Sequence, residues 1–253
     1  MVGEIVAQHV ERRLGFAVSR RSNLGAALLA YQALQNGEIN IYPEYSGTIV
    51  TDILKETPAD NPDQVFERAK GEMARIAQAD LIGPLGIDSS YVAVVRANHP
   101  FAPGIKTLSE AAQIGGGWKL GYSYQFQQRS DTMPALTQYH LPMEVPMRSM
   151  DAGALYKSMA DGESTMIIGR NTDGALNSTD WKVLADDRKL FTSEQLGLVV
   201  RQDILRAEPR LAGALSELAG KLTNAKMREL NAQVETDHKT PADVARGFLA
   251  GLR

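Results

Sequence analysis

Cysteine is absent from the 253 residues of the sequence. Without thiols the chain has no disulfide framework, zinc–thiolate site, iron–sulfur cluster or cysteine nucleophile. Long apolar runs are absent too, since no window approaches the ~18 consecutive apolar residues of a membrane-spanning helix. There is also no basic stripe interleaved with aromatic residues. These absences argue against a membrane span and against nucleic acid as a partner.

Charge is nearly balanced, because 27 Lys and Arg residues face 30 Asp and Glu residues, for a formal net charge of −3. Neither sign forms a long block. Hydrophobic residues make up 43% of the chain, which is enough to bury a sizeable core. At roughly 100–200 residues per domain, the length fits one large domain or two lobes.

Residues capable of catalysis or metal binding are scattered. No histidine lies in a metal-binding or catalytic-triad motif. We expect surface or loop positions for all four: His9, His99, His140 and His238. Asp186 and Asp187 are adjacent, point in opposite directions on an extended chain, and indicate a solvated charged turn rather than an acid–base pair. The glycines 115–117 lack the Lys-Ser/Thr of a phosphate-binding loop and are expected to form a flexible loop. We therefore expect no metal, no cofactor and no enzyme activity.

Helices and strands alternate along the first third of the chain. Hydrophobic periodicity predicts helices over 1–15, 26–34, 46–54 and 62–77, and strands over 16–18, 39–42 and 81–85. Asn23 is expected to cap the second helix. The alternation indicates an α/β fold with a parallel sheet and ligands bound at the carboxyl ends of its strands.

The same pattern restarts after the β-rich run 91–96. Helices are predicted over 108–113, 133–139, 153–160, 211–218, 224–236 and 241–249, and strands over 119–121 and 165–169. A second β-rich run, 196–200 with Arg201 after it, resembles the first. Two such crossing strands around an α/β insert predict two lobes, one formed by 1–88 with 196–253 and the other by 89–195.

A few positions are candidates for ligand binding. Tyr45 and Thr48 lie between a predicted strand and a predicted helix, at the carboxyl edge of the sheet, although a packed Tyr and an N-capping Thr are the alternative. Tyr91 begins the first crossing strand and either faces a cleft or packs in the hinge. Arg129 lies in a strand-to-helix loop, where it either binds a carboxylate in two-pronged fashion or pairs with Asp131 at the surface.

Together these segments resemble the glycine betaine/carnitine/choline-binding proteins of osmoprotectant ABC importers. The most specific feature is Tyr-Pro-Glu-Tyr-x-Gly-Thr at 42–48, followed by Tyr91, Arg129 and Thr-Asp-Gly at 172–174. The resemblance covers nearly the whole chain and includes 23–25, 32–34 with 37–39, 86–95, 121–131 and 184–191. It implies a type II periplasmic-binding-protein fold, in which two α/β lobes joined by two crossing strands close around a ligand.

The resemblance also implies a binding site. In that family a cage of tyrosines holds a quaternary ammonium by cation–π attraction, while an Arg, a Thr and a Lys bind the carboxylate. Tyr45 and Tyr91 match two cage tyrosines, and Thr48 and Arg129 match the carboxylate-binding Thr and Arg. The family's first strand, which carries the Lys, would precede Met1.

Two cage tyrosines of the family are replaced here, by Arg170 and Glu194. Both replacements remove a π face, and Arg170 would repel a trimethylammonium group. Arg129, Arg170 and Glu194 suit a zwitterion with a carboxylate and a hydrogen-bonding ammonium or heteroaromatic ring, so an amino-acid derivative is as plausible as a betaine. Alternatively, Arg170 and Glu194 pair with each other and latch the lobes.

The function implied is that of the solute-binding component of an ABC importer. Its expected partners are a small-molecule ligand and a membrane permease, with the ATPase contacted indirectly through the permease. We expect a monomer in the periplasm or another extracytoplasmic location. An enzyme on the same two-lobed fold and a ligand-sensing domain fused to a permease are the alternatives.

Overall fold

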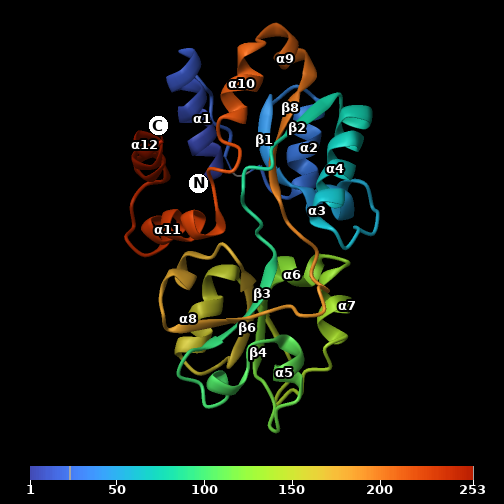
Figure 1. Cartoon of the computed structure of the whole chain (residues 1–253), viewed down its shortest axis with the longest axis vertical. Helices are drawn as coiled ribbons and strands as arrows, with labels where there is room; N and C mark the ends of the chain where they lie inside the picture. The colour runs from blue at the N-terminus through green and yellow to red at the C-terminus, as the bar shows by residue number, and fades with distance from the viewer. Residues whose placement is uncertain (23, 253) are drawn as a thin grey trace. The chain divides into compact units, whose positions relative to one another are not determined.

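The computed structural model describes residues 1–22 and 24–252, so the expected cap at Asn23 lies outside the described residues. The chain forms two compact units: unit 1 is Met1–Ser89 with Ser193–Arg253, and unit 2 is Ser90–Thr192. Each unit has its own sheet with helices packed against it (Figure 1). The chain passes from one unit to the other at residues 89–90 and 192–193.

Unit 1 is mainly helical. Its elements are α1 (Val2–Leu14), α2 (Ala27–Gln35), β1 (Ile41–Tyr45), α3 (Ser46–Thr48), the π-helical turn η1 (Ile49–Ile53), α4 (Pro62–Ala77), β2 (Ala79–Ile82), β8 (Leu196–Arg201), α9 (Gln202–Ala207), α10 (Arg210–Ser216), α11 (Asn224–Glu235) and α12 (Pro241–Gly251). Local sequence sets several of the ends. The Asn61 side chain accepts from the backbone of Asp63 and Gln64 to start α4, and Pro62 occupies its first turn.

The sheet of unit 1 corrects the expectation of a parallel sheet. Among the described residues it has three strands in the order β1-β8-β2, and both contacts with β8 are antiparallel. The two strands that precede unit 2 run in the same direction, but β8 inserts between them on the return of the chain. Residues 16–18, expected to form a strand, are not in a strand.

Side chains of β8 alternate between the two faces of this sheet and so enter two separate cores. Leu198 and Val200 pack with α1, α10, α11 and α12 in one cluster. Val199 packs with α2, α4 and β2 in the other. In Figure 1, α1, α10 and α12 accordingly lie on one side of β8, and α2 and α4 on the other.

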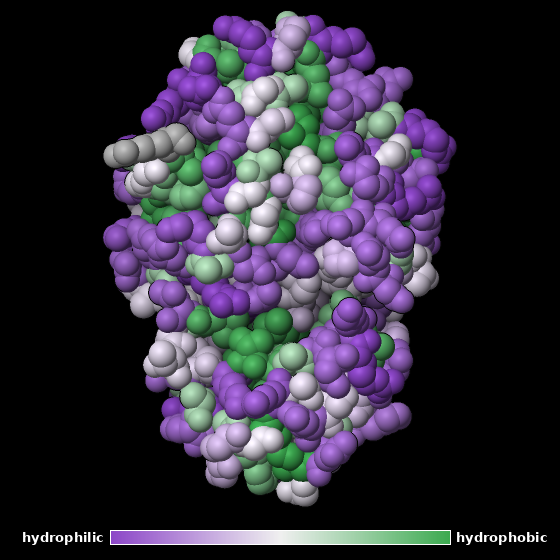
Figure 2. Space-filling view, in the orientation of Figure 1, coloured by the Kyte–Doolittle hydropathy of each residue, from purple (hydrophilic) through white to green (hydrophobic). Residues whose placement is uncertain are grey.

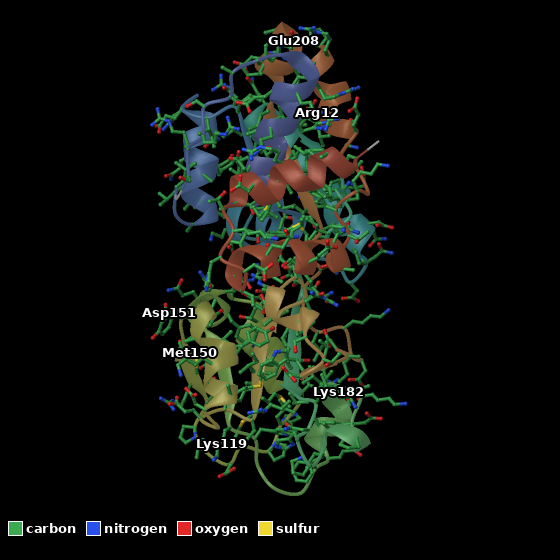
Figure 3. The ribbon with its side chains drawn as sticks, turned by 90° about the vertical axis from the view of Figure 1, so that its left-hand side faces the viewer. Arg12, Lys119, Met150, Asp151, Lys182 and Glu208 are labelled. Carbon is green, nitrogen blue, oxygen red and sulfur yellow. The ribbon has the colours of Figure 1, made fainter. Side chains whose placement is uncertain are left out.

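The first helix of unit 1 is tied to its neighbours by polar contacts. Arg12 donates from Nη1 to the carbonyl of Leu249 at 2.6 Å, which joins α1 to α12 (Figure 3). His9, one turn after Ile5, falls on the buried face of α1, and its Nε2 lies 2.8 Å from the carbonyl oxygen of Ala214. The expectation of a surface or loop position was therefore wrong for His9.

Unit 2 is an α/β unit with short elements. They are β3 (Tyr91–Arg96), the 3₁₀ turn η2 (Ala102–Gly104), α5 (Leu108–Ala112), β4 (Leu120–Ser123), α6 (Tyr124–Gln128), α7 (Thr132–Thr137), β5 (Arg148–Met150), the 3₁₀ turn η3 (Ala152–Ala154), α8 (Leu155–Ala160), β6 (Met166–Arg170), the 3₁₀ turn η4 (Gly174–Asn177) and β7 (Trp181–Leu184). A capping box starts α5, because Thr107 and Glu110 exchange side-chain to backbone hydrogen bonds.

The sheet of unit 2 is mixed. Its five strands in the described part of the chain run in the order β5-β4-β6-β3-β7. Helical crossovers make β4 parallel to β5 and β6, whereas β3 is antiparallel to β6 and β7. The runs expected to be crossing strands are β3 and β8; each belongs to the sheet of one unit, and the chain changes unit just before each of them.

The core of unit 2 is rich in aromatic rings. Its main cluster buries six of them: Tyr91, Trp118, Tyr122, Phe126, Tyr139 and Phe191. Trp118 donates from its indole nitrogen to the carbonyl of Ala111 at 2.9 Å, so its polar atom is satisfied inside the core. His99 lies in a loop, as expected, but it is half-buried against Trp118, and this burial lowers the pKa of its imidazole.

Two loops of unit 2 have contacts that the sequence does not predict. Asp186 is not simply solvated, because its carboxylate accepts hydrogen bonds from the Tyr139 hydroxyl and from the backbone of Leu190 and Phe191. Gly117 packs against a neighbouring segment, since a Cβ on it would lie 2.0 Å from the backbone nitrogen of Glu144. Both residues organise loops that sequence periodicity alone leaves undefined.

The surface in the view of Figure 2 is mostly hydrophilic over each unit, with smaller hydrophobic patches. Over the described residues, no helix combines the length and the apolar character needed to cross a membrane. This agrees with the sequence, which lacks a long apolar run.

Candidate ligand-binding site

The first group of candidate residues lies at one end of the unit 2 sheet. Tyr91 opens β3 and Arg170 closes β6, and the two are direct partners in the antiparallel register. Cross-strand partners project to the same face, so their side chains meet. The guanidinium carbon of Arg170 is 3.7 Å from the centroid of the Tyr91 ring, and Nη2 donates to the Tyr91 hydroxyl at 2.9 Å.

Asp173 holds the end of β6 next to this pair. Its Oδ2 accepts hydrogen bonds from the backbone nitrogen of Arg170 at 2.8 Å and from the Tyr156 hydroxyl at 2.9 Å. A Cβ at Gly169 would lie 2.6 Å from that oxygen, so glycine leaves room for the carboxylate. The Thr-Asp-Gly motif is therefore linked directly to the backbone from which the Arg170 side chain projects.

Arg129 follows α6 and forms a two-pronged ion pair with Asp131. Its Nε donates to Oδ1 at 3.0 Å and its Nη2 to Oδ2 at 2.8 Å. Thr192 also donates to Oδ2, at 2.8 Å. Burial opposes ionisation of Asp131, but the hydrogen bonds and charge of Arg129 outweigh it and hold the pKa of the carboxyl below its usual value. This pair fixes the plane of the guanidinium.

The ring of Tyr91 is held by two other rings of the core. Phe126 meets it at a centroid distance of 4.8 Å and an interplanar angle of 89°, and Phe191 at 6.4 Å and 63°. The Arg129 guanidinium carbon also lies 6.0 Å from the Tyr91 centroid. Unit 2 therefore brings Tyr91, Arg129 and Arg170 together, as two cations beside one rigidly packed ring.

The second group lies in unit 1, where β1 meets β8. Tyr45 is the last residue of β1 and packs against the apolar cluster that contains Leu196 and Leu198. Thr48 ends α3 and stands at the N-cap position of η1, but its side chain caps neither element and its hydroxyl donates instead to Oε2 of Glu194 at 3.2 Å. The expected N-capping alternative for Thr48 was therefore wrong. Unit 1 brings a hydroxyl and a carboxylate together.

Asp88 is a residue that the sequence interpretation missed. Its Oδ1 accepts from the backbone nitrogen of Glu194 at 3.0 Å, and its Oδ2 from the hydroxyl of Ser193 at 2.9 Å. Asn224, the first residue of α11, accepts from the Asp88 backbone at 2.8 Å. Asp88 thus fixes the segment that carries Glu194, and its place near the first unit boundary is the signal that could have found it.

The chemistry of the two groups suits binding rather than bond making. Two guanidinium groups provide donors in fixed planes for an anionic group, and a hydroxyl with a carboxylate provides a donor and acceptors for a polar cation. Within residues 1–22 and 24–252, no three His, Cys, Asp or Glu side chains are grouped so that they could hold a metal ion.

The sequence also matches the model of a known protein family. The model named OpuAC, the substrate binding domain of ABC-type glycine betaine transport systems, matches residues 1–251. The chain belongs to the OpuAC family. An OpuAC domain binds a transport substrate and is not an enzyme, so both the expected family and the expected absence of enzyme activity are confirmed by the family assignment.

Individual relatives of this OpuAC domain agree with the assignment. The ergothioneine transport permease/ergothioneine binding protein EgtU of Helicobacter pylori strain G27 is 27% identical over 253 residues, which are 100% of this chain and 45% of that protein. The carnitine transport binding protein OpuCC of Listeria monocytogenes strain 10403S is 24% identical over 98% of this chain and 82% of its own length. The chain therefore spans less than half of the Helicobacter relative.

Solved structures confirm the expected fold class of the OpuAC domain. A crystal structure of a glycine betaine/carnitine/choline ABC transporter superposes with a TM-score of 0.87 and 25% identity, over 98% of this chain and 92% of that one. The chain thus has the α/β, two-lobed, type II periplasmic-binding-protein fold.

Proposed function

We propose that this domain binds a carboxylate-bearing zwitterion of the betaine type and presents it to an ABC permease. The observation that carries the proposal is the Arg129–Asp131 pair. Asp131 engages the Nε–Nη2 edge of the guanidinium and so holds this group in one plane, a geometry suited to binding a ligand carboxylate. A fork held in one plane loses little conformational entropy when it binds a second carboxylate.

The names of the relatives support a ligand of this class. They refer to ergothioneine, carnitine and glycine betaine. Each of these compounds combines a carboxylate with a trimethylammonium group. In the proposed complex Arg129 binds the carboxylate, and Tyr45 offers its ring to the trimethylammonium group.

Arg170 and Glu194 favour a ligand with further polar atoms. Arg170 has five N–H donors in a planar group, and Glu194 has two acceptor oxygens. A heteroaromatic ring with a donor and an acceptor would engage both side chains. Glycine betaine has only its carboxylate and its trimethylammonium group, so it offers no further polar atom to Arg170 or Glu194. We therefore propose that a ring-bearing betaine such as ergothioneine binds more tightly than glycine betaine, with Arg170 and Glu194 contacting the ligand.

Calorimetric titration of the domain with a small panel tests the ligand class. The panel contains ergothioneine, carnitine, glycine betaine, histidine and choline. Choline keeps the trimethylammonium group but has no carboxylate, so it is expected to bind at least about tenfold more weakly than the best zwitterion, the equivalent of roughly 1.4 kcal/mol. Choline binding as tightly as the carboxylate compounds would contradict the proposal.

We propose that the domain acts outside the cytoplasm, as a monomer or as part of a permease chain. The Helicobacter relative, whose name joins a permease to a binding protein and of which this chain spans 45%, favours the fused arrangement. Co-expression with the permease encoded by the same chain or a neighbouring gene, followed by uptake of labelled ligand, tests this partnership. Uptake that does not require the domain would argue against it.

A further inference from the structure

The Arg170–Tyr91 contact has a consequence for ligand selection. A tyrosine ring attracts a cation through its π face, and a cation over that face is attracted most strongly near the ring centroid. In unit 2 that place is taken by the protein itself, because the guanidinium carbon of Arg170 lies 3.7 Å from the centroid. The Nη2 hydrogen bond to the Tyr91 hydroxyl, at 2.9 Å, fixes the guanidinium along the same ring.

We propose that Arg170 is a built-in cation that excludes the ligand's ammonium group from Tyr91. A second cation on this face would have to displace the guanidinium and would be repelled by it. The contact is reinforced by the antiparallel register, which places the two residues opposite each other. Tyr91 therefore acts as a support for Arg170, and the ligand meets donors rather than a π face at this position.

Asp173 is the positioning residue for this cation. Its Oδ2 accepts from the Arg170 backbone at 2.8 Å and from the Tyr156 hydroxyl at 2.9 Å. The strand end from which Arg170 projects is thus fixed from behind by a carboxylate. The absence of a Cβ at Gly169 leaves space for that carboxylate. Removing the Asp173 charge should loosen the guanidinium from the ring without removing either partner of the stack.

Whether the Arg170 guanidinium occupies the face of the Tyr91 ring can be tested without the natural ligand. Protein with ¹³C-labelled tyrosine is titrated with tetramethylammonium chloride at constant ionic strength, and the Tyr91 signals are assigned by their loss in Tyr91→Phe. In Arg170→Gln, which keeps a polar side chain but shortens it and removes the charge, Tyr91 should respond at about 3- to 30-fold lower tetramethylammonium concentration than in the unchanged protein. An equal response in the two proteins would overturn the proposal.

Unit 2 offers a matched control for this titration. Arg188 lies over the ring of Tyr139, with 5.4 Å between the guanidinium carbon and the centroid. Arg188→Gln removes a second arginine from a second tyrosine of the same unit and leaves the Arg170–Tyr91 pair intact. The Tyr91 response should therefore remain that of the unchanged protein; a gain equal to that of Arg170→Gln would show a general charge effect and overturn the assignment.

A second arm measures selectivity and rests on the proposed function. Glycine betaine and 3,3-dimethylbutyrate have the same shape and carboxylate, but only the former has a positive charge. The ratio of their affinities isolates the charge preference. It should shift toward glycine betaine by about 3- to 30-fold in Arg170→Gln. A smaller shift in the same direction is expected in Asp173→Asn, and a near-original ratio in Asp173→Glu.

The two arms separate the possible failures. If Asp173→Asn weakens both ligands but leaves their ratio unchanged, Asp173 is structural and its positioning role is overturned. If none of ergothioneine, carnitine and glycine betaine binds the unchanged protein while the tetramethylammonium result is as expected, the proposed ligand class is wrong and the role of Arg170 stands. Melting temperatures of all variants identify any that fail to fold.

Discussion

Unit 2 supports its candidate binding residues with aromatic rings, whereas the main core of unit 1 is aliphatic. Phe126 and Phe191 contact the Tyr91 ring directly, and Tyr91 in turn carries Arg170. The corresponding cluster under β8 in unit 1 consists of Ile, Val, Leu, Ala and Met side chains in its buried part. Stiff planar rings transmit a displacement to their neighbours, while aliphatic side chains change rotamer at lower cost. We infer that core changes in unit 2 alter binding as well as stability, and that those in unit 1 mainly alter stability.

The largest effect on ligand affinity is expected at the Arg129–Asp131 pair of unit 2. Arg129→Ala removes one partner of the Arg129–Asp131 pair and the proposed carboxylate contact, so binding of the best zwitterion should weaken by about 2–5 kcal/mol. Calorimetric titration measures this loss. Thr48→Val in unit 1 is the matched comparison, with an expected loss of about 1 kcal/mol for one hydrogen bond. Equal losses of affinity in the two variants would contradict the proposed difference between the units.

A core substitution in unit 1 tests the other side of the comparison. Leu215 in α10 is fully buried, so Leu215→Ala should lower the free energy of unfolding by about 3 kcal/mol through lost burial and a cavity. Chemical denaturation gives this value, and titration of the folded variant should give an unchanged affinity. Phe126→Leu in unit 2 serves as the contrast, because it should lower both stability and affinity. A large loss of affinity in Leu215→Ala would contradict the inference.

Restoring a ring in place of Arg170 should raise the affinity for glycine betaine by an intermediate amount. Arg170→Tyr removes the repelling guanidinium and supplies a π face, so glycine betaine should bind more tightly by about 0.5–2 kcal/mol. Arg170→Tyr/Glu194→Tyr should add a second face and a further gain. Calorimetry of both variants against glycine betaine measures the change. No gain in either would mean that these side chains do not reach the ligand.

The smallest effect on ligand affinity is expected from a change of pH. The pKa of Asp131 is depressed, so its ion pair with Arg129 is complete above the ordinary aspartate pKa of about 3.9 and is lost only as pH falls through the lower folded value. Affinity should therefore change by less than about twofold between pH 8 and pH 5. Asp131→Asn should bind more weakly over this whole range. A loss of affinity centred between pH 5 and 7 in the unchanged protein would show that a titratable group other than Asp131 controls ligand binding.

Much of the local structure could be predicted from the sequence. The helix over 62–77 was predicted with both ends correct, because Asn61, Pro62 and the apolar spacing are local signals. The direction of the sheet in unit 1 could not be predicted, since β8 enters it only after the chain has passed through unit 2. His9 was misplaced because its burial depends on polar partners in α10 and just after it, Ala214 and Glu217, which lie more than 200 residues away in the sequence.

The candidate site shows the same division. By itself the sequence determined the kinds of side chain available, namely no thiol, two arginines, a glutamate and the tyrosines of a motif that resembles a binding-protein family, and these predicted a binding domain rather than an enzyme. Only the tertiary structure decided how they are used. Arg170 lies over Tyr91 although they are 79 residues apart, and Thr48 meets Glu194 across 146 residues. Such pairs depend on strand register and on β8 returning beside β1, and neither is encoded in any short stretch of the chain.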